Sequence, residues 1–171
     1  MLRPDVISVV ALAAVLVMMV GELMLSRSNE RILRRRGAVE PAGDVYRTLA
    51  WAYPTMFMAM AIEGAVAASL PGATTMAGVL VFGAAKMLKF WAISTLGPRW
   101  TYRVLVPPAA PLVSSGPYAR LRHPNYVAVF GEIIGMAMVV DSPITGTMSL
   151  IGFAVLVRRR IVVEEKALGR G

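Results

Sequence analysis

Long apolar runs are the feature that most limits how this chain can fold. Hydrophobic residues make up 57% of its 171 residues and come in blocks. The blocks cover residues 5–25, 46–70, 74–96, 126–140 and 144–157. The first three are near or above the roughly 20 residues that a helix needs to cross a hydrocarbon core. Turn-forming residues separate the last two, which predicts a helical hairpin. We therefore predict an all-α integral membrane protein with about five transmembrane helices in one domain, residues 1–171.

Basic residues gather in the segments that follow the first, third and fifth runs. Fifteen of the 18 lysines and arginines lie there, if Arg47 at the very start of the second run is counted with the segment before it, and the formal net charge is +8. Five crossings place these three segments on one side of the membrane. Because basic loops stay in the cytoplasm, we expect the N-terminus outside and the C-terminus in the cytoplasm. The excess charge then attracts anionic membrane lipid, and no nucleic acid partner is expected.

A polar, basic segment stands directly before the fourth run and holds the only histidine of the chain, His123. Proline is favoured at the first position of a helix, so Pro124 predicts a helix start at this point. The free N–H groups of such a start can bind a negatively charged ligand group. We therefore expect a ligand site where the chain enters the membrane.

A second polar element follows the last run. Residues 158–169 are predicted to form a cytosolic helix, on which Arg160 and Glu164 stand four residues apart and share one face. The hairpin between the two polar elements returns the chain to the side that it left. We therefore predict a cytosolic cofactor pocket formed by the loop before the fourth helix and this C-terminal helix.

Apart from Asp5 and Arg47 at the starts of their spans, five charged residues fall inside the predicted spans, where charges are costly and often functional. They are Glu22, Glu63, Lys86, Lys89 and Glu132. We expect the two lysines and Glu63 to extend toward the membrane surface. For Glu132, a functional role and an ion pair with a lysine of the third run remain equal alternatives. The Gly131 and Gly135 pair predicts close helix packing, from which no dimer is inferred.

Taken together, the segments 122–126 and 160–165 resemble the bipartite signature of the isoprenylcysteine carboxyl methyltransferase family, which is similar also to membrane phospholipid N-methyltransferases. The resemblance extends from Leu96 to Leu168. It implies that S-adenosylmethionine binds in the cytosolic part between the two motifs and that a lipophilic acceptor enters from the bilayer. The loop that begins at Leu96 looks more like short bacterial members, which are associated with methylating alkylpyrones and phenolic lipids, than like enzymes for prenyl-type carboxylates.

The resemblance also implies which residues serve the reaction. Cofactor binding would fall to Gly116, Tyr118, Arg122, His123, Pro124, Asn125, Tyr126, Glu164 and Glu165. Glu165 and His123 are the candidates for a catalytic base, and Arg160 either orients the acceptor or holds Glu164. With no cysteine and one histidine, a transition-metal centre lacks ligands, and no metal is expected.

Two other classes of function stay open at this point. An NADPH-dependent sterol or steroid-type reductase has a similar His-Pro-Asn-Tyr helix entrance, and Arg120 could bind its cofactor's phosphate. A non-catalytic membrane scaffold would use the same polar elements only to anchor helix ends. The identity of the acceptor and the oligomeric state are beyond what the residues indicate.

Overall fold

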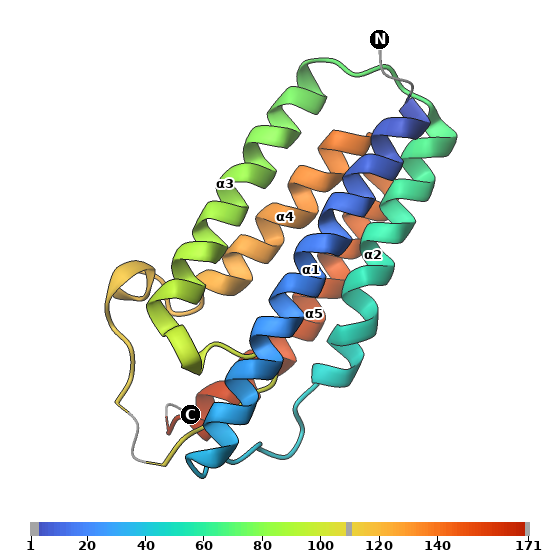
Figure 1. Ribbon diagram of the computed structural model, residues 1–171. Coiled ribbons are helices and arrows are strands. Elements are labelled where there is room, and N and C mark those ends of the chain that lie inside the picture. The colour runs from blue at the N-terminus through green and yellow to red at the C-terminus, as the bar shows by residue number, and fades with distance from the viewer. Residues whose placement is uncertain (1–3, 109–110, 170–171) are drawn as a thin grey trace.

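The computed structural model describes residues 4–108 and 111–169, and it is all-helical, as predicted (Figure 1). Its long helices are α1 (Pro4–Arg35), α2 (Tyr46–Ala67), α3 (Ala73–Leu96), α4 (Pro124–Val140) and α5 (Pro143–Ala167). Two short 3₁₀ turns, η1 (Gly97–Arg99) and η2 (Gly116–Ala119), lie in the link between α3 and α4. Long helices that follow one another in the chain run in opposite directions, and the five form one bundle (Figure 1).

Three helices of the described chain, α1, α2 and α3, are long and apolar enough to cross a membrane. Helix α4 is also apolar but has only 17 residues. It begins at Pro124, whose fixed φ and missing N–H suit the first position of a helix. It ends before Asp141, which adopts a left-handed conformation with φ of 55°. Pro143 then starts α5, so the predicted hairpin turn is confirmed.

Two predicted helix boundaries are wrong. Helix α1 continues for ten residues beyond the predicted end at residue 25, and these added turns carry polar side chains that hold the link between α3 and α4. The predicted fifth span and the predicted separate helix 158–169 are one continuous helix, α5. No helix-breaking residue lies near Val157, so the helix continues there although the residues change from apolar to charged.

Helices α3 and α4 pack closely because glycines face the contact. A Cβ on Gly135 would lie 2.6 Å from the backbone nitrogen of Phe82, and one on Gly131 would lie 2.8 Å from the Cβ of Ala85. The small-residue pair therefore acts within the chain, as the packing interpretation predicts. An apolar core led by Phe57, Ile133 and Phe153 fills the contact among α2, α4 and α5.

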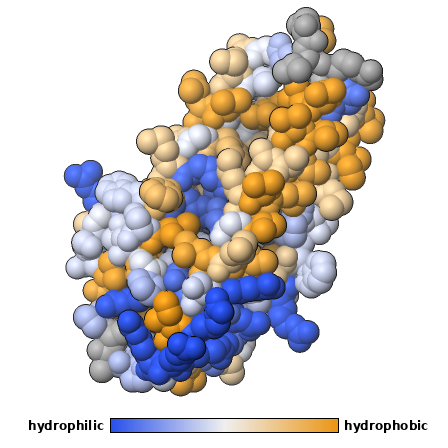
Figure 2. All heavy atoms as spheres, viewed as in Figure 1, coloured by the Kyte–Doolittle hydropathy of each residue, from blue (hydrophilic) through white to orange (hydrophobic). Residues whose placement is uncertain are grey.

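One end of the bundle, which we call the basic end, brings together the α1–α2 link, the α3–α4 link and the end of α5 (Figure 1). Strongly hydrophilic side chains cover this end in Figure 2, whereas apolar side chains dominate the rest of the visible surface. A bridge between Val39 and Val106 ties the two links together. The segments in which the sequence concentrates arginine are therefore neighbours in space.

A cluster of four charged side chains lies inside the bundle, and we call it the interior cluster: Glu22 of α1, Lys86 and Lys89 of α3, and Glu132 of α4. Lys89 Nζ is 2.6 Å from Glu22 Oε2 and 3.3 Å from Glu132 Oε1. Lys86 Nζ is 2.9 Å from Glu22 Oε1 and 3.1 Å from Glu132 Oε1. The Tyr53 hydroxyl donates to Glu132. Of the two alternatives for Glu132, the ion pair is the one that the structure shows.

The expectation that Lys86 and Lys89 extend to the membrane surface is wrong, whereas Glu63 is partly exposed at the end of the bundle where α5 begins. The Lys89 side chain is only 3% exposed, because two carboxylates bind it inside the bundle. Glu63 accepts hydrogen bonds from the backbone N–H groups of Ile144 and Thr145, at 3.0 and 2.6 Å. It thereby caps the start of α5 from a different helix.

Candidate functional site

The two polar motifs of the sequence meet at the basic end. His123 precedes α4, and its carbonyl accepts hydrogen bonds from the N–H groups of Tyr126 and Val127. Its imidazole points to α5, where Nε2 is 3.4 Å from Glu165 Oε1 and Nδ1 is 3.9 Å from Glu164 Oε2. The ring also stacks on Tyr126, with 5.5 Å between centroids. The structure therefore places the loop before α4 against the polar half of α5.

Tyr126 and Arg122 add further contacts between the same two elements. The Tyr126 hydroxyl donates to Glu164 Oε2 at 2.8 Å. Arg122 Nη1 lies 3.6 Å from Glu165 Oε1, although the Arg122 side chain remains 80% exposed. We call residues 122–126, which lead into α4 and form its first turn, the α4 entrance. Each of the two glutamates thus contacts a basic or hydrogen-bonding group of the α4 entrance. The long separations around Glu165 leave its carboxylate accessible to a ligand.

Arg160 is buried behind this contact and uses all parts of its guanidinium. Nε donates to the Tyr126 hydroxyl at 2.8 Å, and Nη1 donates to Asp44 Oδ1 at 3.2 Å. Nη2 donates to the backbone carbonyl of Tyr102. The spacing of Arg160 and Glu164 predicts a direct pair. In the structure the Tyr126 hydroxyl lies between them, because it accepts from Arg160 and donates to Glu164. Arg160 therefore connects the site to both links of the basic end.

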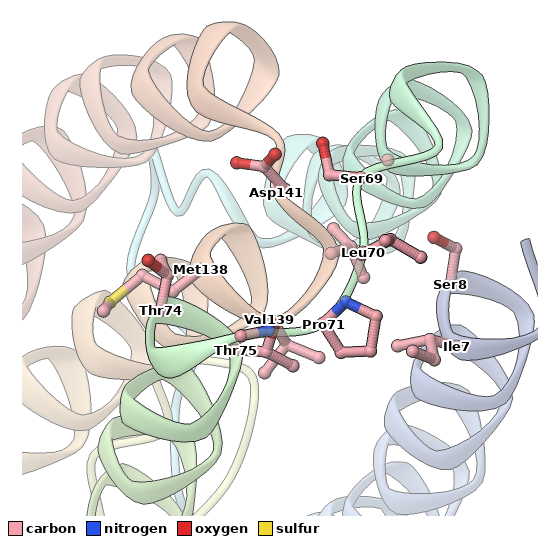
Figure 3. Close-up of a pocket in the computed structure, with 13 residues that line it drawn as sticks. Ile7, Ser8, Ser69, Leu70, Pro71, Thr74, Thr75, Met138, Val139 and Asp141 are labelled. Atoms are coloured by element: carbon pink, nitrogen blue, oxygen red, sulfur yellow. Dashed lines mark hydrogen bonds between the residues drawn. The ribbon is translucent and has the colours of Figure 1, made fainter. Parts of the chain in front are cut away.

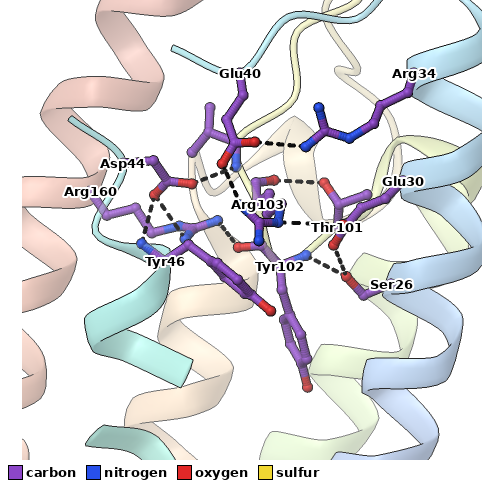
Figure 4. A network of polar contacts seen from close by, with 11 residues as sticks. Ser26, Glu30, Arg34, Glu40, Asp44, Tyr46, Thr101, Tyr102, Arg103 and Arg160 are labelled. Carbon is purple, nitrogen blue, oxygen red and sulfur yellow. Dashed lines mark hydrogen bonds and ion pairs between the residues drawn. The ribbon is translucent and has the colours of Figure 1, made fainter. Parts of the chain in front are cut away.

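Asp44 is the residue that the sequence analysis missed. It lies in the α1–α2 link, its side chain is 3% exposed, and its carboxylate faces Arg160 (Figure 4). The same carboxylate accepts hydrogen bonds from the N–H groups of Val104 and Tyr46, at 2.9 and 3.1 Å. An aspartate that accepts from the N–H group two residues further on forms an Asx turn, a common local pattern. Its pairing with Arg160, 116 residues away, depends on the tertiary fold.

Helix α1 holds the α3–α4 link through Tyr102. The Tyr102 N–H donates to Ser26 Oγ at 2.8 Å, and its hydroxyl donates to Glu22 Oε2 at 2.9 Å. Burial and the nearby Glu22 carboxylate raise the pKa of Tyr102 far above its ordinary value, so the hydroxyl remains a donor. Tyr102 therefore links the interior cluster to Arg160.

The next polar contacts along this link fix the α4 entrance. Asn29 of α1 donates to the Trp100 carbonyl at 2.8 Å, and the Trp100 indole donates to Asn125 Oδ1 at 3.3 Å. Gly116 adopts a positive φ of 54°, and a Cβ there would lie 2.6 Å from Thr95 Oγ1 of α3. Burial and the charge of Glu164 raise the pKa of Tyr118. The predicted site residues thus lie around one region, held in place by α1 and α3.

Two hollows differ in size and position. One of about 430 Å³ lies beside the site and is lined by Val162, Glu165, Lys166 and Gly169. The other, of about 120 Å³, lies at the opposite end of the bundle, where Ile7, Pro71 and Val139 line it (Figure 3). All four residues that line the first hollow lie on one side of the end of α5 or just past it, so this hollow is open to the surface beside Glu165.

The fold is that of an all-helical membrane protein, and a cluster of polar and charged side chains lies at one end of its bundle. The sequence model of the isoprenylcysteine carboxyl methyltransferase (ICMT) family matches residues 76–170, which is more than half of the chain. The chain belongs to this family of membrane methyltransferases. The match covers α3, α4 and α5, so it includes both polar motifs, whereas α1 and Asp44 lie outside it.

Two relatives align over nearly the whole length. The uncharacterized protein YpbQ of Bacillus subtilis is 29% identical over 157 residues, which are 92% of this chain and 94% of the relative. An uncharacterized protein of Haemophilus influenzae is 24% identical over 160 residues, 93% of each chain. Both alignments are long enough to extend into the part of the chain before residue 76, which the family model does not match.

Proposed function

We propose that this chain is an integral membrane, S-adenosylmethionine-dependent methyltransferase that methylates an oxygen of a lipophilic acceptor. The acceptor is an alkylpyrone, a phenolic lipid or a prenyl-type carboxylate. The observation that carries the proposal is the contact of His123 with Glu165 across the α4–α5 hairpin. It joins the two halves of the family motif beside an open surface hollow at Glu165.

The charges around the site fit the zwitterionic amino-acid end of S-adenosylmethionine. Arg122 and the positive end of α4 suit its carboxylate, and Glu164 or Glu165 suits its ammonium group or ribose hydroxyls. Arg122 is 80% exposed and Glu165 24% exposed, so both can be reached by a ligand. Gly116, Tyr118, Pro124, Asn125 and Tyr126 complete the proposed cofactor-binding set.

When bound, the cofactor supplies an electrophilic methyl group. The residues of the chain align the acceptor oxygen with it and exclude water. His123 and Glu165, whose Nε2 and Oε1 atoms are 3.4 Å apart, are the proposed acceptors of the proton that a hydroxyl acceptor releases. Arg160 is proposed as a positioning residue, because Tyr126, Asp44 and the Tyr102 carbonyl already occupy its guanidinium.

We propose that the basic end faces the cytoplasm of a bacterial inner membrane. The three arginine-rich segments lie together at this end (Figure 1), and the positive-inside rule assigns such segments to the cytoplasm. The N-terminus is then outside and the site opens to the cytoplasm, where S-adenosylmethionine is made. A lipophilic acceptor reaches the site from the bilayer.

Isothermal titration of the purified protein with S-adenosylmethionine, S-adenosylhomocysteine and NADPH tests the proposal. We expect the first two ligands to bind and NADPH to give no heat of binding. Binding of NADPH alone would instead identify a reductase, and binding of none of the three would identify a scaffold. Incubating the protein with a membrane lipid extract and radiolabelled S-adenosylmethionine, followed by chromatography of the product, then identifies the acceptor.

A further inference from the structure

Placing the charged side chains of the interior cluster inside the membrane costs free energy, and the packing of α3 against α4 does not depend on them. Charged side chains inside a membrane are unfavourable unless they are paired or serve a function. Glycine contacts and an apolar core already hold α3 against α4. The cluster nevertheless places two lysines and two glutamates together, with contacts of 2.6–3.3 Å. Its formal charges cancel.

The cluster is closed on one side and partly open on the other. Glu132 is fully buried and Lys89 is 3% exposed, whereas Glu22 is 13% and Lys86 17% exposed. These two more exposed residues belong to α1 and α3. Figure 2 shows hydrophilic atoms in the gap between α1 and α3, with apolar side chains around them. The opening therefore faces the apolar surface that contacts lipid.

The opening also has room beside it. Gly21 precedes Glu22, and Gly83 lies about one turn before Lys86; a Cβ added to either glycine would meet no atom within 4 Å. Nearby large side chains on the same two helices, such as Met18 and Phe90, are 44% and 73% exposed. An acyl or alkyl chain can lie along these apolar side chains while a polar group reaches the cluster.

We propose that Glu22 and Lys86 bind the polar end of an uncharged, hydroxyl-bearing amphiphile that enters from the bilayer between α1 and α3. A hydroxyl can donate to the Glu22 carboxylate while its oxygen accepts from the Lys86 ammonium group. Because two lysines balance two glutamates, the cluster offers no net charge to attract an anionic headgroup. The site is therefore selective for a neutral headgroup over a fatty acid carboxylate.

This inference rests on the proposed function, in which the amphiphile is the methyl acceptor. Tyr102 joins the two sites, because its hydroxyl bonds Glu22 and its carbonyl bonds Arg160. Along α4, Glu132 lies six residues from Tyr126, which corresponds to about 9 Å of helix rise. The cluster is thus next to the cofactor region on the membrane side, where the polar end of an acceptor must pass.

The test measures binding of tritiated 3-pentadecylphenol to the protein in lipid nanodiscs, with empty nanodiscs as the baseline. Pentadecylbenzene, which lacks the hydroxyl, and palmitic acid, which is anionic, are the competitors. We expect saturable binding of the phenol and at least tenfold weaker competition by the other two. Equal competition by either compound would overturn the proposal.

Two variants test the location of the site. The double variant Glu22→Gln with Lys86→Met keeps the charge balance, and we expect it to weaken phenol binding at least tenfold. Gly21→Leu leaves every charge in place and adds a bulky side chain next to Glu22, in the space that the amphiphile would occupy, so it should weaken binding similarly even if the double variant fails to fold. Arg31→Met, an exposed change on α1, is the matched control and should bind like the original protein. Unchanged binding in Gly21→Leu would overturn the proposal.

The binding assay contains no methyl donor, so it is independent of the proposed function. Unaltered phenol binding in the folded double variant, together with normal S-adenosylmethionine binding, would remove this site and leave the methyltransferase proposal intact. If both variants lose phenol binding and the original protein binds no S-adenosylmethionine, the amphiphile site is supported and the methyltransferase proposal fails.

Discussion

The two polar regions of this protein differ in how tightly their charges are paired. In the interior cluster, Lys89 contacts two carboxylates at 2.6 and 3.3 Å, and its side chain is almost fully buried. At the basic end, His123 lies 3.4 and 3.9 Å from its two glutamates, which are 24% and 31% exposed. The contact between the buried Lys89 and Glu132 is fixed by folding, whereas the longer, accessible contacts of the basic end can rearrange around a ligand. We therefore expect a change of charge at Lys89 to affect stability most, and a change of charge at the basic end to affect activity most.

The largest expected effect is on activity at the basic end. Glu165→Gln and His123→Ala should each lower methyl transfer to the lipid extract roughly 10²–10⁴-fold, the range for loss of an acid–base group. Both proteins should still elute as folded, monodisperse species from size-exclusion chromatography in detergent. Arg159→Gln, an exposed change on the same helix, is the control. Full activity in both variants would refute the roles given to Glu165 and His123.

The largest effect on stability is expected in the interior cluster. Lys89→Met leaves Glu22 and Glu132 with Lys86 as their remaining lysine, and breaking a buried pair typically costs about 3–5 kcal/mol. The expected result is a lower midpoint of unfolding in sodium dodecyl sulfate, with Lys166→Met as the exposed control. Equal midpoints for the two variants would mean that the cluster is not the fixed, stabilising region described above.

Asp44→Asn tests the connection behind the site. It removes the negative charge that faces Arg160 and keeps the shape of the side chain, so we expect destabilisation of about 1–3 kcal/mol. Displacement of Arg160 should lower kcat by up to roughly 100-fold, while the Kd of S-adenosylmethionine changes much less. Asp44→Glu, which keeps the charge, should recover part of kcat. A change confined to stability would show that Asp44 has no positioning role.

Gly135→Ala tests the close α3–α4 contact that supports both regions. Its Cβ would lie 2.6 Å from the backbone of Phe82, and overpacking of this kind costs about 1–3 kcal/mol. The matched control is Gly83→Ala, whose Cβ has open space and which should be neutral or slightly stabilising. Thermal unfolding in detergent compares them. Identical melting temperatures would contradict the packing described for α4.

The smallest effect concerns pH and the exposed part of the basic end. Burial opposes ionisation of Glu40, but hydrogen bonds from Arg34 and Arg103 prevail and lower its pKa below the ordinary value (Figure 4). Its contribution to stability is present above about pH 4.3, the ordinary glutamate pKa, and is lost as the pH falls through the lower folded pKa. Glu40→Gln should therefore flatten slightly the loss of stability measured between pH 5 and 3. An identical pH dependence in both proteins would show that Glu40 contributes nothing.

Local sequence patterns predict much of this fold and site. Apolar length indicates α1, α2 and α3, and Pro124 marks the start of α4 because its effect on the backbone is local. The hairpin also brings His123 near Glu165, as its short turn requires. By contrast, the pairing of Lys89 with Glu22 and of Asp44 with Arg160 depends on how distant helices pack. No pattern near those residues encodes such contacts, so the sequence predicts a surface position for Lys89 and gives no sign of a role for Asp44.

The single histidine allows a direct test of the central claim, that the α4 entrance and the polar half of α5 form one cofactor site. Protein labelled with ¹⁵N only in histidine gives the imidazole signals of His123 alone. Saturating S-adenosylhomocysteine should shift these signals in the original protein, and the shift should be altered in Glu165→Gln. Calorimetric binding of S-adenosylhomocysteine that leaves the His123 signals unchanged would place the cofactor elsewhere and contradict the account.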